Sequence, residues 1–400
     1  MKIVMATPFG LRPRGTASVR ALPLGQALAA RGHQVTLLVP PWDDRATSGQ
    51  SFEQGGVQVR HLRVPDRAAL DVPLLTLRLL RAARAERPDV LHLFKPKAYP
   101  AFLGLLWRAF RRVDATLAHI VMDTDDWEGP GGWNDLSGYT PLQKRLFAWQ
   151  EQWELRHADA VTVASRALES IVLSMGVSPS RLAYLPNGPG IVSTPPDPTE
   201  VESLREALGL PTGAPVALLF TRFWEFDEAQ LARRWARVVA ELPEARLLVV
   251  GKGLHGEEVR FHAELETLGV SNSILDVGFQ PMERLRAYFA LARVALYPMS
   301  DTLVNRAKCP VKLADYMQAG LPVVGEAVGQ VAEYLTGDVG GLLVPSGDDA
   351  AFVSATLRLL RDPEFAAIMG RTGQQRLATR FDWPIQAERA EALYESITRR

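Results

Sequence analysis

Short apolar runs alternate with amphipathic stretches of helix length along most of the chain. Short apolar runs are typical of buried parallel strands, and longer stretches with one polar face are typical of the helices that cover them. In the first half we predict strands at Lys2–Ala6, Gln34–Val39, Val57–Leu62, Asp89–Phe94, Thr116–Met122, Ala160–Val163 and Leu182–Leu185. We predict helices there at Ala17–Arg31, Leu74–Glu86, Pro141–His157 and Arg166–Met175. This order indicates a parallel sheet with helices on both faces.

A proline-rich break between Pro186 and Pro211 interrupts this alternation, and we predict that it cannot continue a sheet or a helix. A second alternation follows, with strands predicted at Pro215–Phe220, Arg246–Val250, Ile274–Val277, Val294–Tyr297, Pro322–Gly325 and Gly341–Val344. Helices are predicted after the last strand at Asp348–Leu360, Glu364–Arg380 and Ile385–Arg399.

The pattern therefore predicts an α/β chain with two doubly wound, Rossmann-like domains that face each other across a cleft. Their predicted limits are 1–188 and 189–380, and a final segment, 381–400, would cross back as a helix onto the first domain. A length of 400 residues exceeds the size at which a single core usually stops growing, which also favours two domains. Ligands of open α/β sheets bind at the carboxyl ends of the strands, so the residues that follow the strands are the ones to inspect.

Charge and cysteine content narrow the possible partners. The 45 basic residues balance 45 acidic ones, so no global field attracts nucleic acid, and we expect no nucleic-acid partner. The single cysteine, Cys309, excludes an internal disulfide framework and fits a reducing cytosol. The apolar run before Pro8 is too short for a signal-peptide core, and we interpret it as the first strand.

No apolar run approaches the roughly 20 residues that span a bilayer, so we expect a cytoplasmic protein that can lie at the inner membrane surface. The candidates for that contact are the basic stretch Arg78–Arg87 and the segment Leu103–Arg112, in which Trp107 and Phe110 lie among arginines. The alternative is an ordinary amphipathic helix that covers the sheet.

Two strand ends in the second half carry cations. Arg222 follows the strand that ends at Phe220, and a guanidinium there suits a diphosphate, although pairing with Glu225 or Asp227 at the surface is an equal alternative. Gly251, Lys252 and Gly253 follow the next strand, where glycines would let the backbone approach a ligand. A plain turn is the alternative for these three residues.

The most specific stretch runs from Asn305 to Val324. Pro310 suits the first turn of a helix, and Gly320 suits its end. The free N–H groups at the start of this helix would offer an anion site at Val311 and Lys312. Asp315 lies three residues after Lys312, so the two side chains share one face, where a phosphate and a sugar hydroxyl would bind; a surface ion pair between them is the alternative.

An acidic loop follows the strand that ends at Met122. It contains Asp123, Asp125 and Asp126 followed by tryptophans and glycines, a composition that suits sugar binding. The Asp-x-Asp spacing leaves a Mg²⁺ site open as an alternative. After the first strand, Gly15 and Thr16 lie in a loop that also contains arginines, and a loop without a ligand is one interpretation of it.

Taken in order, several motifs resemble those of the family 4 glycosyltransferases of the GT-B fold. The specific one is Pro-x-Lys-Leu-x-Asp-Tyr-Met-x-Ala-Gly-x-Pro-Val-Val, which begins at Pro310 and resembles the family's donor-site helix. The other matching stretches, spread over nearly the whole chain, are Arg31–Val35, Ala158–Val161 with Ser165, Pro186–Gly188, Thr221–Arg222, Val250–Gly253 and Phe381–Trp383.

The resemblance implies an enzyme that transfers a hexose-type sugar, with retention, from a UDP- or GDP-linked donor to a glycan, lipid-linked or small-molecule acceptor. It implies no cofactor and no metal, because positive side chains and a helix N-terminus would neutralise the leaving diphosphate. Members of the family often act in cell-envelope or exopolysaccharide assembly, so the resemblance suggests such a pathway. A GT-B epimerase, a phosphorylase and a non-catalytic subunit that binds nucleotide sugars remain alternatives.

By the same resemblance Asp315 would bind the ribose hydroxyls. It also implies that the loop with Gly15 and Thr16 faces the donor phosphates and that the acidic loop after Met122 orients an acceptor hydroxyl. The chain departs from the family at Ala307, where an acidic residue usually meets the transferred sugar, and at Asp227, near the place of an expected lysine. We assign catalysis to Arg222, Lys312, Asp123, Asp125 and Asp126. We assign donor binding to Gly15, Thr16, Gly251, Lys252, Gly253, Asn305, Lys308, Pro310, Val311 and Asp315.

Overall fold

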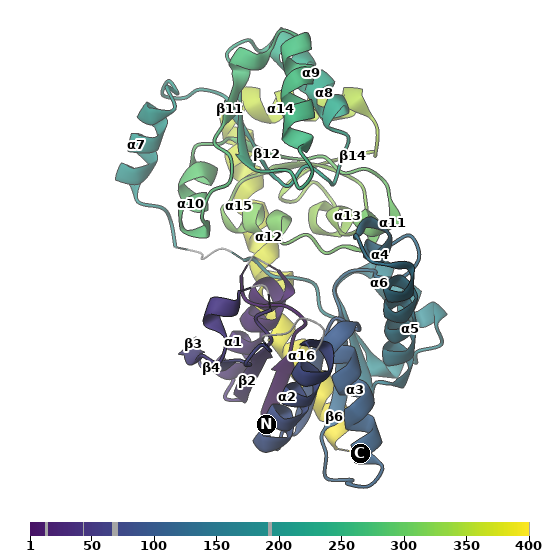
Figure 1. Ribbon diagram of the computed structural model, residues 1–400. Coiled ribbons are helices and arrows are strands. Elements are labelled where there is room, and N and C mark those ends of the chain that lie inside the picture. The colour runs from purple at the N-terminus through teal and green to yellow at the C-terminus, as the bar shows by residue number, and fades with distance from the viewer. Residues whose placement is uncertain (13–14, 43, 66–70, 191–193, 400) are drawn as a thin grey trace. The chain divides into compact units, whose positions relative to one another are not determined.

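The computed structural model describes residues 1–12, 15–42, 44–65, 71–190 and 194–399 of the chain. It divides into two compact units (Figure 1). Unit 1 comprises Met1–Gly188, Ala307–Cys309 and Phe381–Arg400, and unit 2 comprises Pro189–Arg306 and Pro310–Arg380. The chain therefore leaves the first unit and returns to it twice.

Unit 1 is built on an eight-stranded sheet with the order β3-β4-β2-β1-β5-β6-β7-β8. Its strands are β1 (Lys2–Ala6), β2 (Gln34–Val39), β3 (Ser51–Gln54), β4 (Val57–His61), β5 (Val90–Phe94), β6 (His119–Thr124), β7 (Ala160–Val163) and β8 (Leu182–Tyr184). All neighbours are parallel except β3 and β4, which are antiparallel. The strand order reverses between β1 and β5, and the carboxyl ends of these strands mark the place where ligands of such sheets bind.

Helices cover both faces of this sheet (Figure 1). They are α1 (Leu22–Ala30), α2 (Asp71–Glu86), α3 (Ala98–Arg111), α4 (Trp133–Leu136), α5 (Pro141–His157), α6 (Arg166–Ser174) and α16 (Trp383–Thr398), with a π-helical turn at Ala17–Ala21 and 3₁₀ turns at Arg45–Thr47 and Pro179–Arg181. Side chains of α2, α3, α5 and α6 fill the core on one face, and those of α1 and α16 fill it on the other.

Unit 2 contains a six-stranded parallel sheet with the order β11-β10-β9-β12-β13-β14. Its strands are β9 (Val216–Thr221), β10 (Arg246–Gly251), β11 (Ile274–Asp276), β12 (Val294–Tyr297), β13 (Val323–Glu326) and β14 (Gly341–Val344). The order reverses between β9 and β12, so the carboxyl ends of these two strands are the expected ligand site of this unit.

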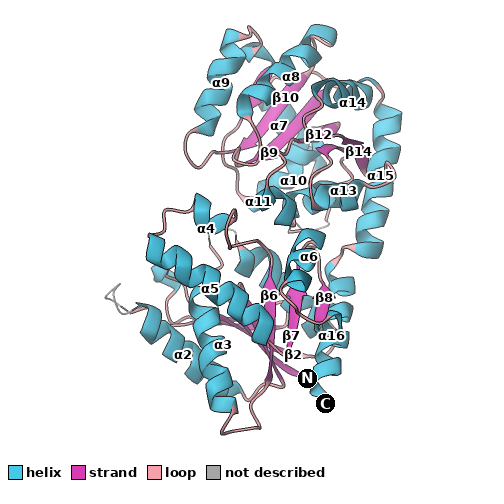
Figure 2. Cartoon of the chain, turned by 90° about the vertical axis from the view of Figure 1, so that its right-hand side faces the viewer, coloured by secondary structure: helices cyan, strands magenta, loops and turns pink. Residues whose placement is uncertain are grey.

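The helices of unit 2 lie on both faces of its sheet (Figure 2). They are α7 (Pro198–Ala207), α8 (Glu228–Glu241), α9 (Glu257–Thr267), α10 (Met282–Ala290), α11 (Leu303–Ala307), α12 (Val311–Gln318), α13 (Gln330–Leu335), α14 (Asp349–Arg361) and α15 (Pro363–Arg380), with a 3₁₀ turn at Ser271–Ser273. The core on one face is formed with α8, α9, α14 and α15. On the other face Phe220, Phe289 and Tyr316 pack ring against ring, with centroid distances of 5.7 and 5.3 Å.

Two expectations are wrong in detail. The proline-rich break contains a helix, α7, because Asp197 accepts a hydrogen bond from the Thr199 N–H and Pro198 occupies the first turn, where a proline loses no intrahelical bond. Trp107 does not face outward: it is fully buried and donates its indole N–H to the Ala118 carbonyl. Helix α3 is thus an amphipathic helix that covers the sheet. Among the described residues, no helix has the length and apolar character needed to span a bilayer.

Candidate active site

The loop after β9 presents Arg222 at the point where the strand order of unit 2 reverses. Phe223 adopts a left-handed backbone, with φ of 67°, and its N–H donates to the Thr221 hydroxyl at 2.8 Å. A bulky residue rarely takes this conformation, and such strain is common at functional sites. Because Phe223 is fully buried in the core, it anchors the loop, while Arg222 beside it is exposed.

Glu225 and Lys312 join this loop to helix α12. The Lys312 Nζ lies 3.1 Å from the Glu225 Oε1, and the exposed fractions of the two side chains are 15% and 5%. Nζ also lies 5.6 Å from the centre of the Phe220 ring. Lys312 therefore forms an ion pair with Glu225, whereas the ion-pair alternative had expected Asp315 as its partner.

The backbone around Glu225 is tied to the loop after β12. Its carbonyl oxygen accepts hydrogen bonds from the Ser300 N–H at 2.9 Å and from the Asn305 Nδ2 at 2.8 Å. Asn305 is buried and donates also to the Ser300 carbonyl. Asn305 thus fixes the two loops at this edge of the sheet.

Helix α12 begins at Val311, directly after Pro310, whose side chain has no acceptor that could cap the first N–H groups. Asp315 is fully buried on this helix, and its Oδ1 accepts from the Gly190 N–H at 2.6 Å. A ribose bound at Asp315 would have to share or displace that contact. Lys308, which precedes Pro310, is half-buried.

Close packing of the backbone requires a glycine at Gly251, where the loop after β10 begins. Gly251 has φ of 131°, and a Cβ there would lie 1.9 Å from the Thr221 carbonyl oxygen. The N–H of Gly253 donates to Glu258 at 3.1 Å, so this part of the loop is already bonded to a carboxylate of the chain. Lys252 between the glycines is exposed. These contacts agree with the plain-turn alternative for the two glycines.

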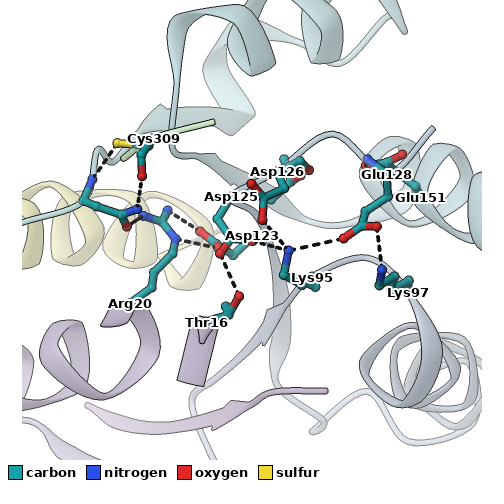
Figure 3. Close-up of polar contacts among 12 residues, drawn as sticks. Thr16, Arg20, Lys95, Lys97, Asp123, Asp125, Asp126, Glu128, Glu151 and Cys309 are labelled. Atoms are coloured by element: carbon teal, nitrogen blue, oxygen red, sulfur yellow. Dashed lines mark hydrogen bonds and ion pairs between the residues drawn. The ribbon is translucent and has the colours of Figure 1, made fainter. Parts of the chain in front are cut away.

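Unit 1 holds a buried charge network at the corresponding edge of its own sheet (Figure 3). Arg20, which is 1% exposed, donates from Nε and Nη2 to the two oxygens of Asp123 at 2.8 and 2.6 Å. Asp123 accepts a further bond from the Thr162 hydroxyl at 2.6 Å. Asp123 is fully buried and is the counter-ion of Arg20. This corrects our prediction that Asp123 faces an acceptor.

Lys95 is the centre of the second part of this network. Its Nζ lies 3.1 Å from Asp125, 2.8 Å from Asp126 and 3.2 Å from Glu128. Lys97 Nζ bonds the other Glu128 oxygen at 2.5 Å (Figure 3). Of the three aspartates, Asp126 has the most exposed side chain, at 22%.

The charges in the network set its protonation. Burial disfavours the Lys95 ammonium, but the surrounding carboxylates outweigh burial and hold the pKa of Lys95 well above its ordinary value. Burial likewise opposes the Asp125 carboxylate, and Lys95 and Arg20 outweigh it and lower the pKa of Asp125. Burial raises the pKa of Asp126, against the attraction of Lys95.

Of the two candidate residues near the first strand, Thr16 belongs to the same network and Gly15 bonds within its own turn. Thr16 donates its hydroxyl to Asp125 Oδ2 at 2.8 Å. Gly15 donates its N–H to the Ser18 hydroxyl at 3.1 Å. Within the described part of the chain, no group of three or more histidine, cysteine, aspartate or glutamate side chains is arranged to hold a metal ion.

The segment Ala307–Cys309 lies in unit 1 and is clamped there. Ser165 donates its hydroxyl to the Ala307 carbonyl, and Asn187 donates Nδ2 to the Cys309 carbonyl at 2.8 Å. Asn187 accepts in turn from Arg20 at 2.8 Å. Ala307 itself is fully buried in the core of unit 1, so its side chain cannot contact a sugar.

Sequence reasoning missed Arg20, Lys95, Lys97 and Glu128. Lys95 directly follows a predicted strand, and the rule that singled out Arg222 would have found it. Arg20 gave no such signal, because its partner Asp123 is 103 positions away.

Comparisons with known proteins match both halves of the chain to glycosyltransferases. Residues 15–188 match the family described as Glycosyl transferase 4-like domain, and residues 214–362 match the family described as Glycosyl transferases group 1. The chain is 26% identical to the 2-deoxystreptamine N-acetyl-D-glucosaminyltransferase of Streptomyces fradiae, over 90% of this chain and 86% of that protein. It is also 26% identical to the D-inositol 3-phosphate glycosyltransferase of Xylanimonas cellulosilytica, over 98% and 94%.

Solved structures show the same fold. The sucrose-phosphate synthase of Thermosynechococcus elongatus superposes with a TM-score of 0.74 at 21% identity, over 99% of this chain and 98% of that one. Anabaena HepE in complex with UDP and glucose superposes with a TM-score of 0.71 at 18% identity, over 98% and 99%.

Proposed function

The chain belongs to the group 1 glycosyltransferases of the GT-B fold, and we propose that it moves a hexose-type unit from a UDP- or GDP-linked donor, with retention and without a metal. The observation that carries the proposal is the placement of Arg222 and Lys312 at the β9/β12 edge of unit 2. Arg222 follows β9, and Lys312 lies in the first turn of α12, whose start has no side-chain cap. These two cations would neutralise a leaving diphosphate, which is the role a metal has in other sites.

For the acceptor we propose a small polyhydroxylated ring. Two relatives that align over most of this chain carry names with 2-deoxystreptamine and inositol 3-phosphate, both of which are cyclitols. The partly exposed carboxylate of Asp126 in unit 1 would bind hydroxyls of such a ring. The alternative is a glycan or lipid-linked acceptor, and this alternative includes contact with a membrane surface.

The test is a binding panel followed by one substitution. We expect UDP or GDP, and the matching sugar nucleotides, to raise the melting temperature of the protein, because a ligand bound only to the folded state stabilises it by mass action. Lys312→Ala should then lower turnover by about 10²–10³-fold, the usual cost of one group that stabilises transition-state charge.

Lys144→Ala is the control, since Lys144 lies at the surface of unit 1, near Asp135 and in no proposed site. Unchanged turnover in Lys312→Ala would remove this lysine from the mechanism. Binding of nucleotide with no transfer from any donor would favour the non-catalytic alternative.

A further inference from the structure

The carboxyl end of β5 places one buried lysine among three carboxylates of unit 1. Lys95 is the first residue after this strand, beside the point where the strand order reverses. Its Nζ lies 3.1 Å from Asp125, 2.8 Å from Asp126 and 3.2 Å from Glu128 (Figure 3). All three carboxylates belong to the loop that follows β6. A single ammonium group therefore joins these side chains to the end of the neighbouring strand.

The backbone of Lys95 is fixed in a conformation that lysine rarely adopts. The register of β5 and β6 pairs Phe94 with Asp123, and the Lys95 N–H donates to the Asp123 carbonyl at 2.9 Å. The φ of Lys95 is 62°, in the left-handed region where residues other than glycine are uncommon. Such strain gathers at functional sites. The sheet therefore holds this lysine, at a cost in backbone strain, where the acidic loop begins.

Negative charge exceeds positive charge in this buried group. Lys95 and Lys97 face the carboxylates of Asp125, Asp126 and Glu128. Carboxylates that are buried together repel one another, and each raises the pKa of its neighbours. Burial and the charges of Asp125 and Glu128 raise the pKa of Asp126, and the contact with Lys95 opposes this rise. The ionised form of Asp126 therefore depends on Lys95.

The other charged groups around this lysine act on the neighbours of Asp126. Arg20, on the π-helical turn, helps Lys95 to lower the pKa of Asp125. Glu151, on α5, accepts the Glu128 N–H at 3.2 Å, and burial and the charge of Glu128 raise the pKa of Glu151 well above its ordinary value. The contact that stabilises the carboxylate of Asp126 is the one with Lys95.

We propose that Lys95 is a positioning residue, which keeps the Asp126 carboxylate ionised and in place to accept hydroxyls of the acceptor ring. This inference rests on the proposed function and concerns the acceptor half of the reaction. The side chain of Asp126 is 22% exposed, so a ligand can reach it. An ionised carboxylate accepts hydroxyl groups more strongly than a neutral carboxyl does. Loss of Lys95 should therefore weaken the use of acceptor and leave the binding of nucleotide, which we propose for unit 2, unchanged.

The experiment follows the pH dependence of transfer in Lys95→Met, a side chain of similar length without charge. Sugar is transferred from UDP-glucose, UDP-N-acetylglucosamine or GDP-mannose to 2-deoxystreptamine or inositol 3-phosphate, with the pair that the wild type uses. We expect kcat/KM for the acceptor to fall toward low pH, with a midpoint about 1–3 pH units higher in Lys95→Met than in the wild type. This is the usual effect of losing an opposite charge within about 4–6 Å. The dissociation constant of the free nucleotide should change by less than about twofold.

Two further variants test the sign of the effect and provide a matched control. Glu128→Gln removes a carboxylate that repels Asp126, so the midpoint should move in the opposite direction, to lower pH. Lys97→Met removes a lysine that is as buried as Lys95 but bonds Glu128 at 2.5 Å. It should move the midpoint less than half as far as Lys95→Met does.

A midpoint that stays in place in Lys95→Met would overturn the inference, because a lysine with a purely structural role lowers transfer equally at every pH. Equal shifts in Lys95→Met and Lys97→Met would also overturn it. If Lys95→Met does not fold, a midpoint that fails to move down in Glu128→Gln decides against it. A wild-type chain that binds a sugar nucleotide but uses neither acceptor would overturn the proposed acceptor and this inference with it. A chain that binds no nucleotide would overturn the proposed function itself.

Discussion

At the scale of single residues, close backbone approach explains the glycine that follows β10. Gly251 packs against the Thr221 carbonyl, in the strand that leads to Arg222, and its φ of 131° is one that side chains rarely adopt. This glycine therefore determines how near β9 and the β10 loop can lie.

Gly251→Ala should destabilise unit 2 by about 2–4 kcal/mol, because the new methyl group would overlap the carbonyl and the backbone would be strained. Gly256→Ala in the same loop is the control: it also has a left-handed φ, of 80°, but no atom lies within 4 Å of the added Cβ. It should cost about 1–2 kcal/mol. Urea unfolding measures both, and equal losses would contradict the steric explanation.

The sequence predicts the position of a residue best when that position depends on nearby residues of the chain. The sequence placed Arg222 after a strand and Lys312 at a helix start, because such positions are set by a few neighbouring residues. Their roles in the site stay predictions. The partner of Lys312 was not found, since Glu225 is 87 positions away and only the fold brings the two together.

At the scale of elements, helices α3 and α5 lie side by side in unit 1 and are joined by a buried ion pair (Figure 2). Arg108 of α3 bonds Glu154 of α5, whose side chain is fully buried. Gly104 makes this approach possible, because a Cβ there would lie 2.6 Å from the Glu154 Oε2. Burial outweighs the attraction of Arg108 and raises the pKa of Glu154 from 4.5 to about 7.

This shift predicts a pH dependence of stability. A folded-state pKa above the unfolded value means that the folded chain binds the proton more tightly, so the contribution of Glu154 is fully present below pH 4.5 and is lost as the pH rises through about 7. The loss is at most about 3 kcal/mol, from about 1.4 kcal/mol per pKa unit.

Glu154→Gln removes this titration. The variant should therefore gain stability relative to the wild type as the pH rises from 4.5 to 8, by up to about 3 kcal/mol. Urea unfolding of both proteins at the two pH values measures this difference. A difference that does not change with pH would show that Glu154 is ionised throughout.

The elements themselves were predicted where their pattern was apolar. The bounds of β1, β2, β7, β12 and β14 agree with the predicted ranges, because most residues of each are apolar and buried. The antiparallel edge strand β3 was missed, since all four of its residues are exposed and carry no such pattern. Helix α7 was missed because prolines were taken only as breakers.

At the scale of the whole molecule, the end of the chain is part of the core of unit 1. Tyr394 of α16 bonds His92 of β5 at 2.7 Å, and His92 contacts the Thr162 hydroxyl at 3.2 Å. Thr162 donates to Asp123, so His92 must donate from Nε2 and accept from Tyr394 at Nδ1. Burial, with the charge of Arg20, lowers the pKa of His92 to about 3, so this histidine is neutral and does not titrate near neutral pH.

Helix α16 should therefore be required by unit 1 and not by unit 2. Apart from Gln386, its buried side chains are Trp383, Ala387, Ala390, Leu393, Tyr394 and Ile397. The four large ones contribute about 1.5–3 kcal/mol each, which together equals the whole stability of a typical domain. A chain that ends at residue 380 should lose the calorimetric transition of unit 1 and keep a second transition that nucleotide shifts upward. A chain lacking only the last two residues is the control. Retention of both transitions after removal of 381–400 would mean that the sheet of unit 1 is stable with one face uncovered.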